Sequence, residues 1–345
     1  MKAAVYEGIE SISIQEKPYP KPGPGQATIK VALCGICGSD VHSYWQGRPG
    51  PPLVLGHEVV GTIEELGEGV EGWKVGDRVV VGPPGSCGEC YVCLAGKPNL
   101  CIHAFERTVG LSPGVDGGMA EYMLAPYPMN MFVKIPDSVS FEDAVLMDTI
   151  AVSFHGIRIS RFKVGDNVVV SGAGPIGLAA IEFLKIGGAG HITVLQPSPI
   201  KREMALKYGA DVGLNPREEG ENLRQKIADM YNGAGADVVV ECAGTPEAFI
   251  TALQVVKYGG HVMLIGTTRQ PSAITESMIA RPEIEIKGSF VYTKDEIRMC
   301  LNYIAEGRFD TEGMVSDIIK LDDIVEKGFK RLAADKSLVK VVIAP

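Results

Sequence analysis

The sequence is poor in positive charge and in aromatic residues. Its 345 residues carry 33 Lys and Arg against 42 Asp and Glu, which gives a formal net charge of −9 at pH 7. Nucleic acid and anionic membranes attract basic surfaces, so this balance argues against either as the main partner. Aromatic residues make up only 7%, whereas 42 Gly and 22 Pro predict many turns and short strands.

The sequence also lacks a secretory signal, a long apolar run, an internal repeat and a low-complexity segment. The opening residues, MKAAVYEGIE, contain no apolar core and no small-residue cleavage site. The most apolar stretch is interrupted by Glu182 and Lys185, so it is too short to span a membrane. We therefore expect a cytoplasmic protein, in which the 8 cysteines are thiols or metal ligands rather than a disulfide framework.

The pattern of apolar residues changes along the chain. The first part reads as short strands rich in β-branched residues, and the later part alternates apolar strands such as DNVVVSGAG with stretches of helical spacing. That alternation predicts a parallel sheet covered on both faces. We expect an α/β protein with a β-rich domain at 1–150, to which 290–345 return, and a doubly wound domain at 151–289.

A glycine-rich turn, VVVSGAGPIG, joins a predicted strand to a predicted helix. It places Gly172, Gly174 and Gly177 in a G-x-G-x-x-G pattern, with Pro175 and Ile176 inside it. The first glycine permits the tight turn, the second admits a pyrophosphate to the backbone amides, and the third lets the helix pack on the strand. Because the helix N-terminus also attracts phosphate, the turn predicts a dinucleotide-binding site.

The position that selects the coenzyme lacks its usual acid. Sites that prefer NAD carry Asp or Glu about 20 residues after the turn, and here that position holds Gln196. An amide does not repel a 2′-phosphate, and Ser198, Lys201 and Arg202 could supply donors or positive charge to NADP. Alternatively, Gln196 bonds the ribose hydroxyls of NAD and Lys201 merely flanks the adenosine. The residues leave NAD or NADP open.

Four cysteines lie close together in SCGECYVCLAGKPNLC. The spacing C-x2-C-x2-C-x7-C suits a closed tetrahedral zinc site that holds a loop rather than performing chemistry. Four unrelated thiols are the alternative, which this density in a reducing compartment disfavours. The predicted structural zinc ligands are Cys87, Cys90, Cys93 and Cys101.

A second group of polar residues occurs in CGICGSDVHSYWQG and LGHEVVG. A catalytic zinc needs three protein ligands and one open position, and Cys37 and His57 are the natural first two. Asp148, an acid inside an apolar run, is the best candidate for the third, unless it is a satisfied core or capping acid. Glu58 could be an exchangeable zinc ligand or a neighbour that orients the ligands.

Ser39 and His42 complete that group. A hydroxyl at the metal followed by an imidazole near the surface could carry the proton of an alcohol to solvent. His42 could also be an exposed loop histidine. Asp40 could accept from the free ring nitrogen of His57, and Cys34, in the strand-like VALCGIC, is expected to be a small buried residue rather than a ligand.

Over essentially its whole length the chain resembles the zinc-containing medium-chain alcohol dehydrogenases, including their polyol, threonine and secondary-alcohol branches. The matching segments are CGICGSDVH, GHEVVGTIEELGEGV, KVGDRVV, the four-cysteine loop, GGMAEY and VVVSGAGPIG. The resemblance implies a GroES-like catalytic domain, an inserted Rossmann domain and an active site in the cleft between them. By position it makes Cys37, His57 and Asp148 the catalytic zinc ligands with Glu58 beside them, and Ser39 the hydroxyl nearest the substrate oxygen.

The chain departs from the polyol branch at one position. That branch typically carries an Arg-Tyr pair after IKG, and this chain has Val291 before Tyr292. The segment MDTIAVSFHG looks more like the secondary-alcohol branch, where Asp takes the ligand position. We therefore expect an enzyme with two zinc ions per chain that transfers hydride between NAD(P) and a small secondary alcohol or ketone. A polyol or L-threonine dehydrogenase is the alternative.

Two other classes of protein compete with this interpretation. A zinc-free quinone reductase has the same two-domain fold, but it has no reason to keep Cys37, His57 and the clustered cysteines. A zinc-module binding protein would explain the four-cysteine loop alone, and the acidic charge and the glycine turn oppose it. By analogy with the family, we expect a homo-oligomer, either a dimer or a tetramer, that acts on a small molecule.

Overall fold

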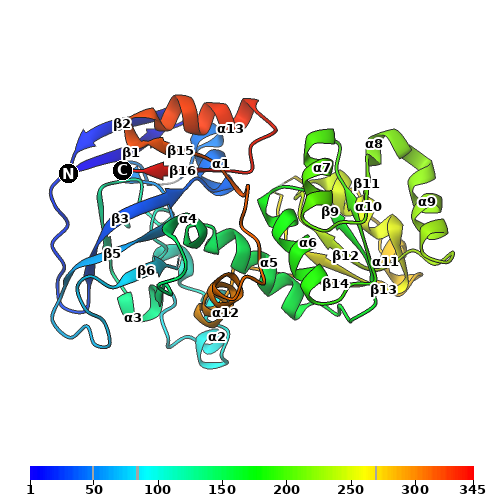
Figure 1. Ribbon diagram of the computed structural model, residues 1–345, viewed down its shortest axis with the longest axis horizontal. Helices are drawn as coiled ribbons and strands as arrows, with labels where there is room; N and C mark the ends of the chain where they lie inside the picture. Colours follow the sequence, from blue (N-terminus) through cyan, green and yellow to red (C-terminus); the bar gives the residue numbers. More distant parts are fainter. Residues whose placement is uncertain (49, 83–84, 269) are drawn as a thin grey trace. The chain divides into compact units, whose positions relative to one another are not determined.

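The structure is a computed structural model that describes residues 1–48, 50–82, 85–268 and 270–345. The chain forms two compact units (Figure 1). The first comprises Met1–Asp148 and Val291–Pro345, and the second comprises Thr149–Phe290. In the described part of the chain, no helix has the length and apolar character needed to cross a membrane.

The first unit is built on a seven-stranded sheet in the order β15-β16-β3-β5-β6-β8, with β7 pairing with β3. A smaller sheet has the order β2-β1-β4. The strands are β1 (Lys2–Gly8), β2 (Ser11–Glu16), β3 (Ala27–Gly35), β4 (Leu53–Val54), β5 (Glu58–Leu66), β6 (Arg78–Val81), β7 (Tyr122–Ala125), β8 (Phe132–Lys134), β15 (Val315–Lys320) and β16 (Lys340–Ala344).

The C-terminal segment belongs to this unit because its last strand pairs with β3. The register sets Val342 and Glu58 on either side of Gly35, the last residue of β3. In Figure 1 the red strand β16 lies beside the blue strands of the N-terminal half. The helices of this unit are α1 (Gly38–Gln46), α2 (Tyr91–Leu94), η1 (Pro98–Leu100), η2 (Ala104–Glu106), α3 (Pro128–Met131), α4 (Phe141–Ala144), α12 (Lys294–Ala305), η4 (Leu321–Asp323), η5 (Ile324–Lys330) and α13 (Arg331–Ala334).

The second unit contains a six-stranded parallel sheet in the order β11-β10-β9-β12-β13-β14. Counted within the unit, this is the order 3-2-1-4-5-6 of doubly wound dinucleotide-binding sheets, and the order reverses between β9 and β12. The strands are β9 (Asn167–Ser171), β10 (His191–Leu195), β11 (Val212–Leu214), β12 (Ala236–Glu241), β13 (Val256–Leu264) and β14 (Glu285–Gly288). The predicted α/β class with a doubly wound sheet is confirmed.

The central strands of the second unit are apolar because helices cover the sheet. Val168, Val169 and Val170 of β9 are fully buried, as parallel strands require. The helices are α5 (Met147–Ile159), α6 (Pro175–Ile186), α7 (Pro199–Lys207), α8 (Pro216–Glu219), η3 (Gly220–Asn222), α9 (Leu223–Met230), α10 (Pro246–Val255) and α11 (Ser277–Ala280), of which α5 begins in the first unit.

Candidate functional site

Four potential metal ligands from separate parts of the sequence meet in the first unit. One ligand atom from each of Cys37, His57, Glu58 and Asp148 lies within 4.8 Å of the others, and we call these residues the mixed cluster. Cys37 precedes α1, and Asp148 lies in the first turn of α5. His57 directly precedes β5, and Glu58 is the first residue of that strand. A sulfur, an imidazole nitrogen and carboxylate oxygens are donors that zinc accepts, so these residues fit that metal.

Asp40 connects two members of the mixed cluster. Its Oδ2 accepts a 3.0 Å hydrogen bond from the backbone N–H of Cys37, which fixes the start of α1. Its Oδ1 lies 3.6 Å from Nδ1 of His57, longer than a normal hydrogen bond. Burial alone would lower the pKa of His57, but Asp40 and Cys37 raise it well above its ordinary value. The Nε2 atom of His57 is the one that lies toward Ser39, at 3.4 Å.

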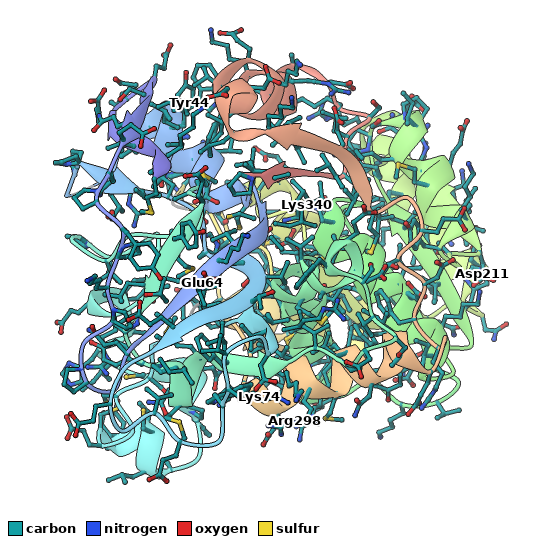
Figure 2. The ribbon with its side chains drawn as sticks, turned by 60° about the vertical axis from the view of Figure 1, so that its left-hand side comes forward. Tyr44, Glu64, Lys74, Asp211, Arg298 and Lys340 are labelled. Atoms are coloured by element: carbon teal, nitrogen blue, oxygen red, sulfur yellow. The ribbon has the colours of Figure 1, made fainter. Side chains whose placement is uncertain are left out.

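Glu58 forms a buried ion pair with Lys340 of β16 (labelled in Figure 2). The Nζ atom of Lys340 donates to Oε1 at 2.6 Å and to Oε2 at 2.8 Å. Burial would lower the pKa of Lys340, but Glu58 and Cys37 raise it, so the ammonium stays charged. Sequence reasoning missed Lys340, although a single charged residue inside the apolar VKVVIA is a signal that could have found it.

Asp148 has a different partner. The hydroxyl of Tyr292 donates to its Oδ1 at 2.6 Å, and the tyrosine is only 1% exposed. Burial and the nearby Asp148 carboxylate raise the pKa of Tyr292 well above its usual range, so the side chain remains a hydroxyl donor. The preceding residue, Val291, has φ +55°, which is strained for a β-branched residue. Sequence reasoning used Tyr292 only to compare branches and missed this contact.

Ser39 and His42 lie one turn apart on α1. Ser39 is exposed, and its Oγ atom lies beside the metal-ligand candidate His57. His42 is half-buried, and its Nε2 atom is enclosed with no hydrogen-bond partner among the described residues. Cys34 is fully buried in β3, as expected, and lies outside the mixed cluster.

The four-cysteine loop forms a second cluster of ligand atoms in the first unit. The Sγ atoms of Cys87, Cys90, Cys93 and Cys101 all lie within 4.8 Å of one another. The Cys87–Cys93 and Cys90–Cys101 pairs are 3.9 Å apart and the Cys87–Cys101 pair is 3.5 Å apart. Zinc with Zn–S bonds of about 2.3 Å in a tetrahedron holds sulfurs about 3.8 Å apart, so the loop fits zinc.

The thiols of this loop influence one another's ionisation. Despite some desolvation, backbone N–H groups of Cys93 and Ile102 lower the pKa of Cys90 to about 6. Desolvation and the neighbouring sulfurs raise the pKa of Cys93 to about 12. Without a metal, one thiolate therefore suppresses the ionisation of the next, and a bound cation would remove that conflict.

The glycine turn in the second unit has the geometry of a phosphate cradle. Gly172 follows β9 with φ +96°, and a Cβ there would lie 2.9 Å from the backbone N of Ala243. A Cβ on Gly177 would lie 2.0 Å from the carbonyl oxygen of Gly172. Close packing therefore leaves no room for a side chain at Gly172 or at Gly177. Gly174 instead faces open space, with nothing within 4 Å of a built Cβ. The open side therefore lies at the N-terminus of α6, where a phosphate group fits.

The other two residues of the turn begin the helix. Pro175 is the first residue of α6, where its missing N–H costs no hydrogen bond. The carbonyl of Ile176 accepts a 2.8 Å hydrogen bond from Ser153 of α5. The predicted cradle residues Gly172, Gly174, Pro175, Ile176 and Gly177 thus form one continuous turn.

Gln196 directly follows β10, as the sequence predicts for the residue that contacts the ribose. Its Oε1 atom accepts from the backbone N–H of Ser198 at 3.1 Å, and Ser198 in turn begins α7 and accepts from the N–H of Lys201 at 3.5 Å. Arg202 donates to the carbonyl oxygens of Gln196 and Pro197, both at 2.7 Å. These contacts bring a guanidinium group to the end of β10.

Comparisons with known proteins match both units. Residues 23–137 match the Alcohol dehydrogenase GroES-like domain family, and residues 175–306 match the Zinc-binding dehydrogenase family. The sorbitol dehydrogenase of Bacillus subtilis (strain 168) is 35% identical, over 100% of this chain and 97% of its own.

The solved structures that are similar over the whole chain include two dehydrogenases. The 2R,3R-butanediol dehydrogenase of Bacillus subtilis is 34% identical with a TM-score of 0.90, and it covers 100% of this chain and 99% of its own. An alcohol dehydrogenase from Thermus sp. ATN1 is 31% identical with a TM-score of 0.92 and the same coverage. The chain therefore belongs to the zinc-containing medium-chain alcohol dehydrogenase family, and it is an enzyme that uses zinc and a nicotinamide coenzyme to transfer hydride between a small secondary alcohol and its ketone.

Proposed function

We propose that the mixed cluster binds a catalytic zinc and that the four-cysteine loop binds a structural zinc, giving two zinc ions per chain. The observation that supports this assignment is the convergence of each set of ligand atoms within 4.8 Å. A zinc ion at the mixed cluster would supply a Lewis acid for the substrate oxygen, and the coenzyme would accept the hydride. The four-cysteine loop offers only thiolates, which suits a closed site without a place for substrate.

In this proposal the residues of α1 move the proton. Ser39 lies next to His57, which is one of the proposed metal ligands. The hydroxyl of Ser39 therefore takes the proton from the substrate alcohol. His42, one turn later, receives that proton at its enclosed Nε2 atom and releases a proton to solvent from its other ring nitrogen, Nδ1. Asp40 holds the start of the helix, so the serine and histidine keep their places relative to Cys37.

For the substrate, we favour small secondary alcohols and vicinal diols over long polyols. Val291 occupies the position that carries arginine in the polyol branch, and a valine offers no hydrogen bond to a polyol chain. The similar proteins include both a sorbitol and a butanediol dehydrogenase, so the family alone allows either class.

The test is a screen of coenzyme-dependent oxidation over 2,3-butanediol, 2-butanol, sorbitol, xylitol and L-threonine. We expect the highest kcat/KM with the butanediol or butanol. Val291→Arg should raise the relative kcat/KM for sorbitol several-fold, and Val291→Leu is the control that keeps the position apolar. A wild-type preference for sorbitol or threonine would refute this substrate assignment.

For the coenzyme, we propose that Gln196 permits NADP. An Asp at this position would repel the 2′-phosphate by about 4 kcal/mol at 4 Å and an effective dielectric constant near 20. Gln196 carries no charge, and Arg202 is held at the same strand end by Gln196 and Pro197.

Gln196→Asp should lower the ratio of kcat/KM with NADP to kcat/KM with NAD by roughly a thousandfold, the factor that about 4 kcal/mol corresponds to. The matched control is Gln225→Asp on α9, which adds the same charge to the same unit. A wild type that already excludes NADP as strongly as the variant would show that another residue selects the coenzyme.

We also propose that the protein is a cytoplasmic homo-oligomer. Large apolar side chains around the four-cysteine loop are exposed, among them Tyr91 at 72%, Leu94 at 75% and Phe105 at 77%. Exposed apolar side chains of this size favour an interface, and eight thiols suit a reducing compartment. Light scattering should give two or four chains per particle and cell fractionation should give cytoplasmic activity, whereas a monomer or an exported protein would contradict this proposal.

A further inference from the structure

The two carboxylates of the mixed cluster have unequal partners. Lys340 donates to both oxygens of Glu58, at 2.6 and 2.8 Å. Tyr292 donates to one oxygen of Asp148 only, at 2.6 Å, so the Oδ2 atom is available to a cation. A carboxylate that already binds an ammonium group with both oxygens is a poor ligand, because the ammonium charge repels the incoming metal.

The sheet contains a slot for the Glu58–Lys340 pair. Strand β3 lies between β5 and β16, and Gly35 of β3 stands opposite Glu58. A Cβ on Gly35 would lie 2.1 Å from Oε2 of Glu58. The absence of a side chain on β3 therefore lets Glu58 reach across the strand to Lys340, and both side chains are at least 95% buried there. The slot holds the carboxylate in place.

We propose that Lys340 is a positioning residue that keeps Glu58 out of the resident ligand set of the catalytic metal. In this arrangement Cys37, His57 and Asp148 hold the metal, and the fourth position stays open for substrate. The inference rests on the proposed catalytic metal site. Glu58 is then not a direct ligand of the metal, a point that the sequence leaves open.

The test uses Lys340→Met, which keeps an unbranched side chain only one atom shorter and removes the charge. Free of Lys340, Glu58 should bind the metal as a fourth protein ligand and close the site. The full-length variant should then bind Co²⁺ at the mixed cluster about tenfold more tightly than wild type, while its kcat falls at least tenfold. The absorption spectrum of the Co²⁺ protein should lose its response to added alcohol. A Cys37→Ser variant identifies which binding phase belongs to the mixed cluster.

The control is the double variant Lys340→Met/Glu58→Gln, which keeps the summed charge of the pair. If Glu58 is not a ligand in the wild type, the double variant should bind Co²⁺ within about threefold of wild type. Its kcat should recover relative to Lys340→Met. The double variant also replaces an ion pair with a neutral pair, which proteins often tolerate, so it remains informative if the single variant does not fold.

Two results would overturn the inference. One is unchanged or weaker Co²⁺ binding in folded Lys340→Met, and the other is a loss of more than tenfold in the double variant, which would make Glu58 a resident ligand. A wild-type protein with no Cys37-dependent Co²⁺ band is a different outcome. It would refute the proposed catalytic metal site itself and the inference with it.

Discussion

The two ligand clusters of the first unit are built in different ways. The four-cysteine loop takes all its ligands from Cys87 to Cys101, a single stretch of chain, and its surroundings are exposed. The mixed cluster takes its ligands from α1, β5 and α5 or the residues beside them, and its carboxylates accept hydrogen bonds from Tyr292 and Lys340 of the segment Val291–Pro345. The ligands of the loop are neighbours in one segment, whereas those of the mixed cluster meet only where α1, β5 and α5 come together in the fold.

The difference also concerns the partners of the ligands. The thiols of the loop accept backbone N–H groups, as Cys87 does from Cys90 at 3.3 Å. The ligands of the mixed cluster contact the side chains of Asp40, Tyr292 and Lys340. Backbone groups support a fixed structural site, and charged or hydroxyl side chains around a metal tune its affinity and leave a position open for chemistry.

The largest expected effect on activity follows removal of a thiolate from the mixed cluster. Cys37→Ala should lower kcat/KM at least about a thousandfold, since a Lewis acid contributes several kcal/mol to the transition state. The folded state should persist because the sheet does not depend on this residue. Zinc analysis should give one ion per chain, and circular dichroism should match wild type. A variant that keeps most of its activity would remove the mixed cluster from the mechanism.

A smaller loss of kcat is expected when His42 is replaced, and no comparable loss when His103 is replaced. His42→Ala should lower kcat by about ten- to a hundredfold near neutral pH, the usual span for an acid–base group. His103, two residues after Cys101, is the matched control, and His103→Ala should have little effect. Imidazole added to the assay should partly restore the His42 variant. An unaltered pH–rate profile in this variant would exclude His42 from the proton path.

Loss of one hydroxyl should weaken metal binding at the mixed cluster. Tyr292→Phe removes the donor to Asp148 and should weaken zinc or Co²⁺ binding there by about tenfold. Tyr91→Phe on the exposed helix α2 is the comparison beside the four-cysteine loop, and it should leave both affinities unchanged. Equal affinities in wild type and Tyr292→Phe would show that the hydrogen bond does not orient Asp148.

The smallest effect on kcat is expected at the four-cysteine loop, where the change should appear in stability. Cys93→Ala should lose one zinc and lower the apparent Tm by about 5 °C or more, because metal binding contributes to folding free energy. Below the transition, kcat should fall less than about threefold. Calorimetry and turnover measured on the same sample test both points. A large loss of kcat without a loss of Tm would make this loop a catalytic element.

The features that could be predicted from the sequence are those that depend on residues close together in the chain. The four cysteines and the glycine turn each lie in one short segment. Their residue types and spacing alone therefore predict a set of zinc ligands and a phosphate-binding turn. The parallel sheet followed from apolar strands alternating with helices, because buried strands need apolar residues on both faces. These patterns depend on neighbouring residues and not on the rest of the fold.

The partners of the mixed cluster could not be predicted in the same way. Lys340 and Glu58 are 282 positions apart, and Tyr292 and Asp148 are 144 apart. Their meeting depends on the order β16-β3-β5 and on the missing side chain of Gly35. The sequence shows Lys340 only as an unexplained charge in an apolar strand, since neither its partner nor the slot appears in the local pattern.

The most direct test of the central claim is a stepwise removal of zinc from active protein, with turnover measured at each step. We predict two zinc ions per chain, of which the one at the mixed cluster exchanges more readily because its site is open. Activity should fall to zero as that first ion leaves, and added Zn²⁺ should restore it. Full activity in protein that has lost the zinc at the mixed cluster would contradict the account.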